Sequence, residues 1–268
     1  MAETGVGIRE AIGLSLLLPL CTSPGSARKE SPLSDAAAAG ITQRGRLLAE
    51  YDFAAQRAKD AVTAMNPQPG SINHYVARKD AQTQKWTVAF GRFSEDKQEF
   101  LVVYEVDQGA NPEGFSVRKN EPPVEDTSFY FFSAKAIDTA VRDFHGAQRP
   151  YNAAVLPADS SGLYVYIVPA QTRPDEYPLG GDARYLISAD GSAVIEARQL
   201  HKTILENRGS VPAGAKGAGG VHSHVLSDVP EDTDVAYVLT RKPSGPEFIG
   251  AGKHVYEIQV DGTIRVQK

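Results

Sequence analysis

Runs of alternating apolar and polar residues, separated by turn signals, are the feature that most constrains the fold of this chain. Residues 85–93 and 98–107 alternate in this way, and the segment between them is short and polar. Asp190-Gly191, a dipeptide typical of a tight hairpin turn, separates two further runs. Alternation gives each strand one apolar face, which another layer of the protein must cover. The sequence therefore predicts antiparallel sheets with helices packed on them.

Two segments have the spacing of amphipathic helices. Residues 41–65 repeat apolar side chains near helical spacing and end at a proline-glycine stop. Residues 133–145 begin at Ser133, a suitable N-cap, and keep one apolar face. Residues 198–207 also look helical. Because strands and helices mix without a strict βαβ rhythm, we predict an α+β fold, with a helix packed on an antiparallel meander followed by a mixed α/β C-terminal half.

Composition divides the chain into four parts. Residues 1–27 are expected to be a leader, and residues 28–40 have the small, polar and aperiodic composition of a linker. Residues 41–122 are expected to form a subdomain of helix and antiparallel sheet, and residues 128–268 the C-terminal domain. Proline, glycine and charged residues are frequent in 111–126, which we interpret as a boundary loop.

The leader contains an apolar stretch at residues 11–20 (AIGLSLLLPL), about as long as the apolar core of a signal peptide. Gly25-Ser26-Ala27 offers small residues for cleavage, so we expect an exported, periplasmic protein. Cys21 resembles the attachment site of bacterial lipoproteins, and the alternatives are a lipid anchor at Cys21 or a leader that is not cleaved. We expect no transmembrane segment, since no apolar run reaches about 18 residues.

Charge and cysteine content restrict the function further. The chain has 28 basic against 33 acidic residues, a net charge of −5, which argues against a nucleic-acid partner bound through bulk charge. The single cysteine, Cys21, allows no internal disulfide and no cysteine-based zinc or iron–sulfur site. Any metal ion must therefore be held by histidines and carboxylates. The oligomeric state is left open by the sequence.

One constellation fits such a metal site. His222 and His224 stand two residues apart in a strand-like segment, so both side chains point to the same face and can bind one ion. Asp234, at the start of the next apolar segment, could supply a third ligand. Two histidines and one carboxylate, with water in the fourth position, form an open catalytic zinc site. We therefore predict that His222, His224 and Asp234 bind zinc.

The same residues carry a family resemblance. His222-Ser223-His224, followed after a short loop by residues 230–234 (PEDTD), resembles the motif of the JAMM metalloproteases, also called JAB or MPN+. The resemblance covers roughly residues 160–268. It implies a zinc-dependent peptidase or isopeptidase that acts on a peptide or protein substrate. It also implies an upstream glutamate as general acid/base, a role to which Glu176 corresponds by position.

The motif is degenerate at two positions, and these leave alternatives open. Val225 stands where the family has proline, and Glu231 replaces the serine that helps to stabilise the transition state. Glu176 and Glu231 are thus the candidate catalytic residues, and a metal could bind while hydrolysis slows or changes. The other reading is a non-catalytic binding or interaction protein that keeps only the scaffold. His201 is a candidate fourth metal or proton-transfer residue, although a lone histidine is more often structural.

Overall fold

The first sheet consists of the alternating runs recognised in the sequence, together with one strand that was not expected. The computed structural model describes residues 33–158, 162–208 and 219–267. The sheet is antiparallel, and its strands follow chain order: β1 (His74–Lys79), β2 (Trp86–Phe93), β3 (Phe100–Gln108) and β4 (Phe115–Asp126). The predicted meander is therefore present, and the sheet extends beyond it by β4.

Strand β4 corrects the expectation of a boundary loop over residues 111–126. Phe115 and Val117 pack against the apolar core, while most of the other β4 side chains are exposed. Because β4 pairs only with β3, it is an edge strand, where polar side chains and proline are tolerated. Its pairing with β3 is irregular between Val102 and Tyr104, as expected where a strand accommodates prolines. The proline, glycine and charged residues that suggested a loop thus belong largely to an edge strand.

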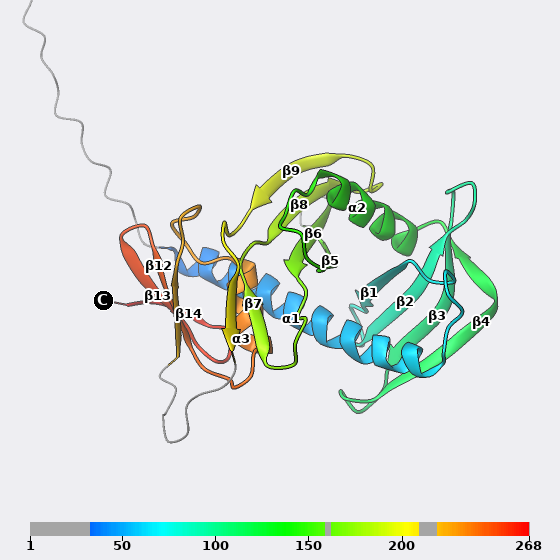
Figure 1. The fold of residues 1–268 in the computed structure, drawn as a ribbon, viewed down its shortest axis with the longest axis horizontal. Helices are drawn as coiled ribbons and strands as arrows, with labels where there is room; N and C mark the ends of the chain where they lie inside the picture. Colours follow the sequence, from blue (N-terminus) through cyan, green and yellow to red (C-terminus); the bar gives the residue numbers. More distant parts are fainter. Residues whose placement is uncertain (1–32, 159–161, 209–218, 268) are drawn as a thin grey trace, which may run out of the picture. The chain divides into compact units, whose positions relative to one another are not determined.

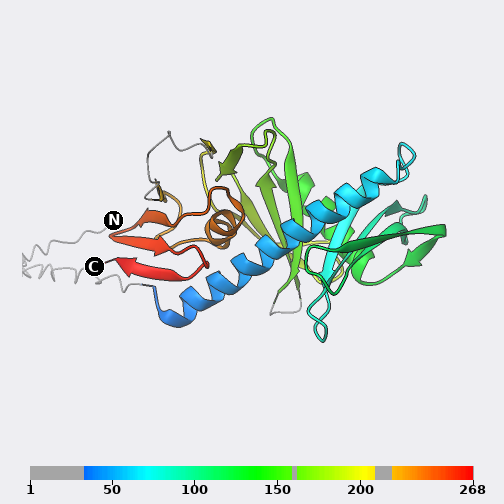
Figure 2. The ribbon, with the colours of Figure 1, turned by 90° about the horizontal axis from the view of Figure 1, so that it is seen from below.

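Helix α1 (Asp35–Ala64) crosses the molecule and contacts elements of both halves. Its buried residues pack on the first sheet, on β5, and on helix α3 and strand β14 of the C-terminal half. Figure 2 shows this helix running from the C-terminal sheet to the first sheet. The helix begins earlier than the predicted residues 41–65, because the Ser34 side chain accepts a hydrogen bond from Ala37 N at 3.3 Å and caps it. Residues 35–40 of the expected linker are therefore helical.

Helix α2 (Phe129–Asp143) covers the second sheet with an apolar face. This antiparallel sheet has the strand order β5 (Tyr151–Pro157), β6 (Gly162–Pro169), β8 (Ala183–Ser188) and β9 (Val194–Gln199). The expected helix over residues 198–207 is wrong, since β9 continues to Gln199. Leu200 then donates its N–H to Asp182 O at 3.0 Å and buries its side chain, so tertiary contacts hold this segment extended.

The C-terminal sheet contains a parallel pair joined by a helix. Strand β11 (Gly220–Ser223) leads through α3 (Asp232–Thr240) to β12 (Glu247–Ala251), which lies parallel beside it. Strands β13 (His254–Ile258) and β14 (Ile264–Gln267) continue the sheet in antiparallel fashion, with α3 packed on it. Figure 1 shows α3 beside α1 at this sheet.

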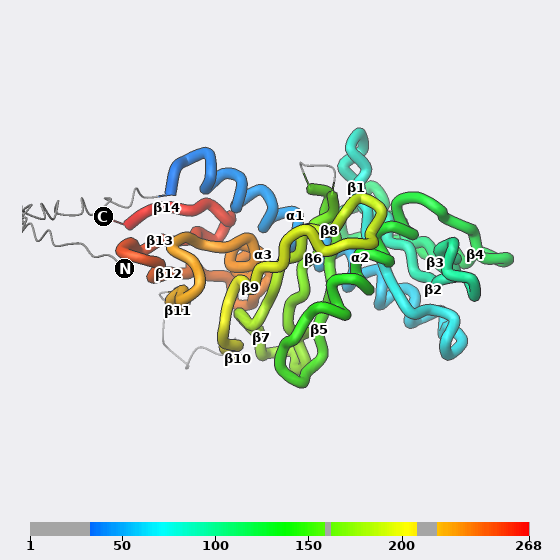
Figure 3. Tube along the Cα trace, turned by 90° about the horizontal axis from the view of Figure 1, so that it is seen from above, coloured from blue at the N-terminus to red at the C-terminus, as the bar shows by residue number. Residues whose placement is uncertain are grey.

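A two-stranded ribbon, β7 (Glu176–Leu179) with β10 (Leu205–Arg208), lies between the second and the C-terminal sheets (Figure 3). The whole arrangement is α+β, as predicted. None of the helices in the described part of the chain combines the length and the apolar character needed to cross a membrane. The predicted leader, with Cys21, and residues 28–32 of the predicted linker lie outside the described residues.

Candidate metal centre

Four side chains from separate parts of the chain converge where the second sheet, the C-terminal sheet and α3 meet. His201, His222, His224 and Asp234 each present one ligand atom, and these atoms all lie within 4.8 Å of one another. The structure thus brings together the three residues predicted as zinc ligands and adds His201. This group could hold a metal ion.

Strand β11 and the start of α3 place the three predicted ligands. His222 lies on β11 opposite Ile249 of β12, and His224 follows directly, with its N–H donating to Gly250 O at 2.8 Å. Asp234 stands in the first turn of α3, where its Oδ2 accepts a hydrogen bond from Glu231 N at 2.7 Å. The same Oδ2 lies 3.2 Å from His224 Nε2, and Oδ1 lies 3.2 Å from His222 Nε2. The strand–loop–helix connection therefore builds the site from local sequence.

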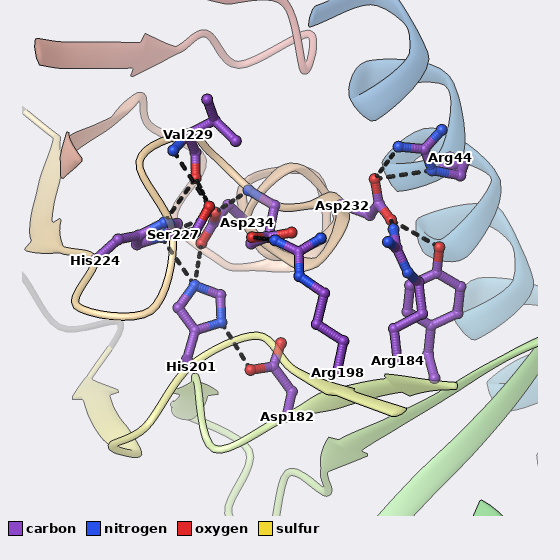
Figure 4. A network of polar contacts seen from close by, with 12 residues as sticks. Arg44, Asp182, Arg184, Arg198, His201, His224, Ser227, Val229, Asp232 and Asp234 are labelled. Atoms are coloured by element: carbon purple, nitrogen blue, oxygen red, sulfur yellow. Dashed lines mark hydrogen bonds and ion pairs between the residues drawn. The ribbon is translucent and has the colours of Figure 1, made fainter. Parts of the chain in front are cut away.

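His201 enters the group from the second sheet, just beyond the end of β9. Its Nε2 lies 2.9 Å from His224 Nε2 and 3.1 Å from Asp234 Oδ1. Its Nδ1 lies 2.7 Å from Oδ1 of Asp182, a carboxylate that is 2% exposed. Figure 4 shows His201 between Asp182 and the pair His224 and Asp234. The sequence carries no spacing signal for this residue, and its place is set by the contacts of Leu200 and His201 with Asp182 just beyond the β8–β9 hairpin.

Each of the three imidazoles has a second partner on its Nδ1 side. His222 Nδ1 lies 2.8 Å from Glu247 Oε1, and His224 Nδ1 lies 2.9 Å from the carbonyl oxygen of Val229. Glu247 is itself held by the Arg241 guanidinium. An acceptor at Nδ1 fixes the tautomer that leaves the Nε2 lone pair free, an arrangement typical of metal-bound histidines. Three such lone pairs and one carboxylate oxygen then face each other and need a cation or protons between them.

Protons satisfy the group when no metal is bound, as the pKa values indicate. Burial disfavours the charged form of His201, but Asp182 and Asp234 outweigh it and raise its pKa to about 11. Burial is likewise outweighed at His222, where Asp234 and Glu247 raise the pKa to about 9. Burial alone would raise the pKa of Asp234, yet hydrogen bonds from the three histidines hold it well below its ordinary value. Metal binding must therefore displace protons from His201 and His222.

Glu231, one of the two predicted catalytic residues, lies at the N-terminus of α3. Its carboxylate caps the backbone N–H of Asp234 and pairs with the Arg198 guanidinium of β9. Burial raises the pKa of Glu231, and the nearby Arg198 opposes that rise. Glu231 thus touches the residue that carries a ligand but does not belong to the converging group. Its catalytic role stays a prediction.

Asp232, next to Glu231, ties the start of α3 to the rest of the molecule. Its carboxylate accepts hydrogen bonds from Arg44 Nε at 3.0 Å, Arg184 Nη1 at 2.6 Å and the Tyr166 hydroxyl at 2.8 Å. These partners come from α1, β8 and β6, and Figure 4 shows Arg44 and Arg184 on either side of the carboxylate. Asp232 is 1% exposed, so this buried network fixes α3, and with it Asp234, against the second sheet.

Glu176, the other predicted catalytic residue, begins β7. Its Oε1 accepts a hydrogen bond from Arg173 Nη1 at 2.9 Å. It is not a member of the converging group, whereas Leu179 at the other end of β7 lies beside it. The general acid/base role that the family resemblance assigns to Glu176 therefore remains a prediction.

An open cavity lies against the histidines. It has a volume of about 320 Å³, and its walls include His201, His222 and His224, with Leu179, Gly180 and Val225 around them. Val225, which replaces the motif proline, is 72% exposed at this cavity. Its size is within the range of small-molecule and substrate sites. The side chains of His201, His222 and His224 are 8%, 4% and 0% exposed, so the cavity ends at the edges of largely buried rings.

In comparisons with known proteins, no family model, no curated protein and no solved structure matches this chain. The assignment of a function therefore rests on the site itself.

Proposed function

We propose that this protein is a zinc-dependent hydrolase of amide bonds, a peptidase or isopeptidase, with peptide or protein substrates. The observation that carries the proposal is the convergence of three imidazoles and one fully buried carboxylate at the wall of an open cavity. Three nitrogen donors and one oxygen donor suit zinc better than magnesium or calcium, which prefer oxygen. The supported imidazole Nδ1 atoms strengthen that assignment, because outer partners of this kind orient zinc ligands.

His222, His224 and Asp234 are proposed to hold the ion. Zinc bound there would supply a Lewis acid that polarises the amide carbonyl and acidifies a water molecule. Glu247 and the carbonyl oxygen of Val229 keep the two imidazoles in the binding tautomer. The cap that Asp234 makes on α3 holds its carboxylate against the histidines, with Oδ1 beside His222 and Oδ2 beside His224.

His201 is proposed as the residue that carries the proton. It is the one member of the group that comes from the second sheet, and its Nδ1 rests against a buried carboxylate, Asp182. Once the proton that His201 holds in the metal-free protein has been displaced by zinc, an imidazole oriented by a carboxylate could accept a proton at Nε2 and return it to a leaving amine. Its Nε2 lies 2.9 Å from His224 Nε2 and 3.1 Å from Asp234 Oδ1, next to the position that the ion would take. Glu176 and Glu231, proposed from the motif, are the variants to compare with it.

A second candidate function is a closed, non-catalytic metal site. It is favoured by one observation, that His201 offers a fourth donor within the same 4.8 Å group. Four protein ligands complete the tetrahedron of a structural zinc site and leave no position for water. In that case the protein would bind a partner or stabilise its fold rather than catalyse hydrolysis.

Metal analysis of the chain, purified without a histidine tag, tests the site. We expect about one zinc per chain, lost in His222→Ala and Asp234→Ala but kept in His145→Ala, whose imidazole is exposed. His201→Asn separates the two candidates. Zinc retained with hydrolysis lost supports the proton carrier, whereas zinc lost supports the closed site. A parent protein that takes up no zinc at neutral pH would overturn both candidates.

Activity is tested next with fluorogenic peptide and isopeptide libraries. Turnover should disappear with a chelator and return when zinc is restored. Loss of turnover in His201→Asn, with Glu176→Gln and Glu231→Gln active, would support His201 as the proton carrier. The opposite pattern would assign that role to a glutamate. No turnover of any substrate by the zinc-loaded parent would remove the hydrolase proposal and leave the closed site.

A further inference from the structure

A second cavity lies between α1, strands β5 and β6 of the second sheet, β7 and α3, with Tyr75 of the first sheet at its wall. It has a volume of about 250 Å³ and shares only Leu179 and Gly180 with the cavity at the histidines. We infer that it binds a small ligand carrying an ammonium or guanidinium group beside a hydrogen-bonding group, the chemistry of a lysine or arginine residue. The inference does not depend on the proposed function.

Three charged residues line this site: Asp52, Asp182 and Lys242. Asp182 is bonded to His201, so Asp52 of α1 is the carboxylate left for a ligand. Its carboxylate lines the cavity and accepts a hydrogen bond from Gln56 Nε2 at 2.7 Å. Within the described residues it makes no ion pair with a basic side chain. Burial raises the pKa of Asp52 to about 6, because Gln56 compensates only part of the lost hydration. A carboxylate that is half-buried without a cation is costly, and a cationic ligand would remove that cost.

Tyrosine rings provide the surface around this carboxylate. Tyr51, Tyr75, Tyr177 and Tyr237 line the cavity. The hydroxyl of Tyr51 accepts from Ala77 N at 3.1 Å, and that of Tyr237 accepts from Asn207 Nδ2 at 2.8 Å, so both rings are held in place. Aromatic rings near a carboxylate favour organic cations, since they add apolar contact for the methylene chain and attraction for the charge. A hydrated metal ion would not use them.

Thr233 marks the position of the second polar group of the ligand. It lines the cavity, it is 7% exposed, and its Oγ1 has no hydrogen-bond partner in the described structure. Buried hydroxyls are nearly always hydrogen-bonded, so an unpaired one at a cavity wall indicates a ligand group there. An amide or hydroxyl of the ligand would satisfy it while the cation meets Asp52.

The size of the cavity limits the ligand to about one amino-acid residue, because drug-sized molecules occupy cavities of roughly 300 Å³ or more. Two exposed side chains, Gln56 and Lys242, stand at its wall and leave it reachable from solvent.

Calorimetric titration of the full chain with capped amino acids tests the inference. The probes are Nα-acetyl-lysine methylamide, Nα-acetyl-arginine methylamide and the norleucine analogue, which keeps the methylene chain but lacks the charge. We expect saturable binding of a basic probe, at least about 10-fold tighter than norleucine. The same titration with agmatine, an arginine analogue that carries a free amine, distinguishes two kinds of ligand. Tighter binding of agmatine than of capped arginine would assign the site to a free amine, and the reverse order to a peptide residue.

Variants locate the binding. Asp52→Asn should weaken the basic probes about 10-fold or more, Asp52→Glu should retain them in part, and Thr233→Val should weaken them several-fold. Asp60→Asn, on an exposed position of the same helix, is the matched control and should leave binding unchanged. Thermal denaturation confirms that each variant is folded. The inference is overturned if the lysine, arginine and agmatine probes show no saturable binding at about 10 mM. Equal affinity for the norleucine analogue, or unchanged binding in Asp52→Asn, also overturns it.

Discussion

Glu247→Gln is the substitution that most directly tests whether the histidines form a supported zinc site. Glu247 is 1% exposed, and its Oε1 lies 2.8 Å from His222 Nδ1. Glutamine has the same shape but no charge, so it keeps the packing while it weakens the support of His222. Its amide can also present an N–H to Nδ1, which would favour the wrong tautomer. The change therefore acts on zinc affinity without touching a proposed ligand.

The expected magnitude follows from the role of such outer partners. Losing one typically lowers metal affinity 10- to 100-fold. At saturating zinc that loss corresponds to about 1.4 to 2.8 kcal/mol less stabilisation of the folded state. For a chain of this size we expect the zinc-induced rise in Tm to fall by about 3 to 11 °C.

Two measurements check this value. A zinc titration against a competing chelator gives the affinity, and thermal denaturation with and without zinc gives the shift in Tm. The difference between loaded and metal-free protein removes the direct effect of the change on the Arg241 contact. Asp138→Asn is the matched control, because Asp138 Oδ1 lies 2.7 Å from His74 Nε2, remote from the site. Zinc affinity in Glu247→Gln within twofold of the parent would refute the role given to Glu247.

Three further predictions follow from the same structure. The metal-free protein should lose stability as pH rises from about 6.5 towards 9 and above. The raised pKa values of His222 (about 9) and His201 (about 11) mean that the folded state binds these protons more tightly than the unfolded state. Denaturant melts at a series of pH values check this, and a flat profile contradicts it. Over the same pH range zinc affinity should increase, because fewer protons compete for the histidines, and chelator titrations at several pH values measure it. Asp232→Ala should lower the free energy of unfolding by about 3 to 5 kcal/mol, because it leaves the largely buried Arg184 uncompensated; a urea melt showing less than about 1 kcal/mol would contradict the buried network.

Much of the candidate site follows from local sequence. The spacing of His222 and His224 determines that both imidazoles share a face of an extended segment. His222 lies on β11, and His224 directly after it continues the pairing with β12 through its N–H to Gly250 O. The acidic segment before an apolar run is a helix start, which is why Asp234 stands at the N-terminal turn of α3. Hairpin signals likewise located β8 and its neighbour, because Asp-Gly allows the tight turn that Gly191 makes at φ 72°.

Other features were decided by tertiary structure alone. Strand β4 is polar and contains prolines, and it forms because β3 offers an unpaired edge. His201 was expected on a helix, yet the hydrogen bond from Leu200 N to Asp182 O keeps its segment extended and directs the imidazole to the site. Asp182 and Glu247 support histidines that lie far from them in the chain.

The division between the two levels has a physical reason. Periodicity and capping act between residues a few positions apart, so local sequence determines the alternating strands, the capped start of α3 at Asp232 and the paired histidines. The fourth member of the group and the buried carboxylates depend on which strands pair and which sheet faces which. Those choices are made by burying apolar surface between distant segments, and only the folded chain brings His201 and Asp182 to the other ligands.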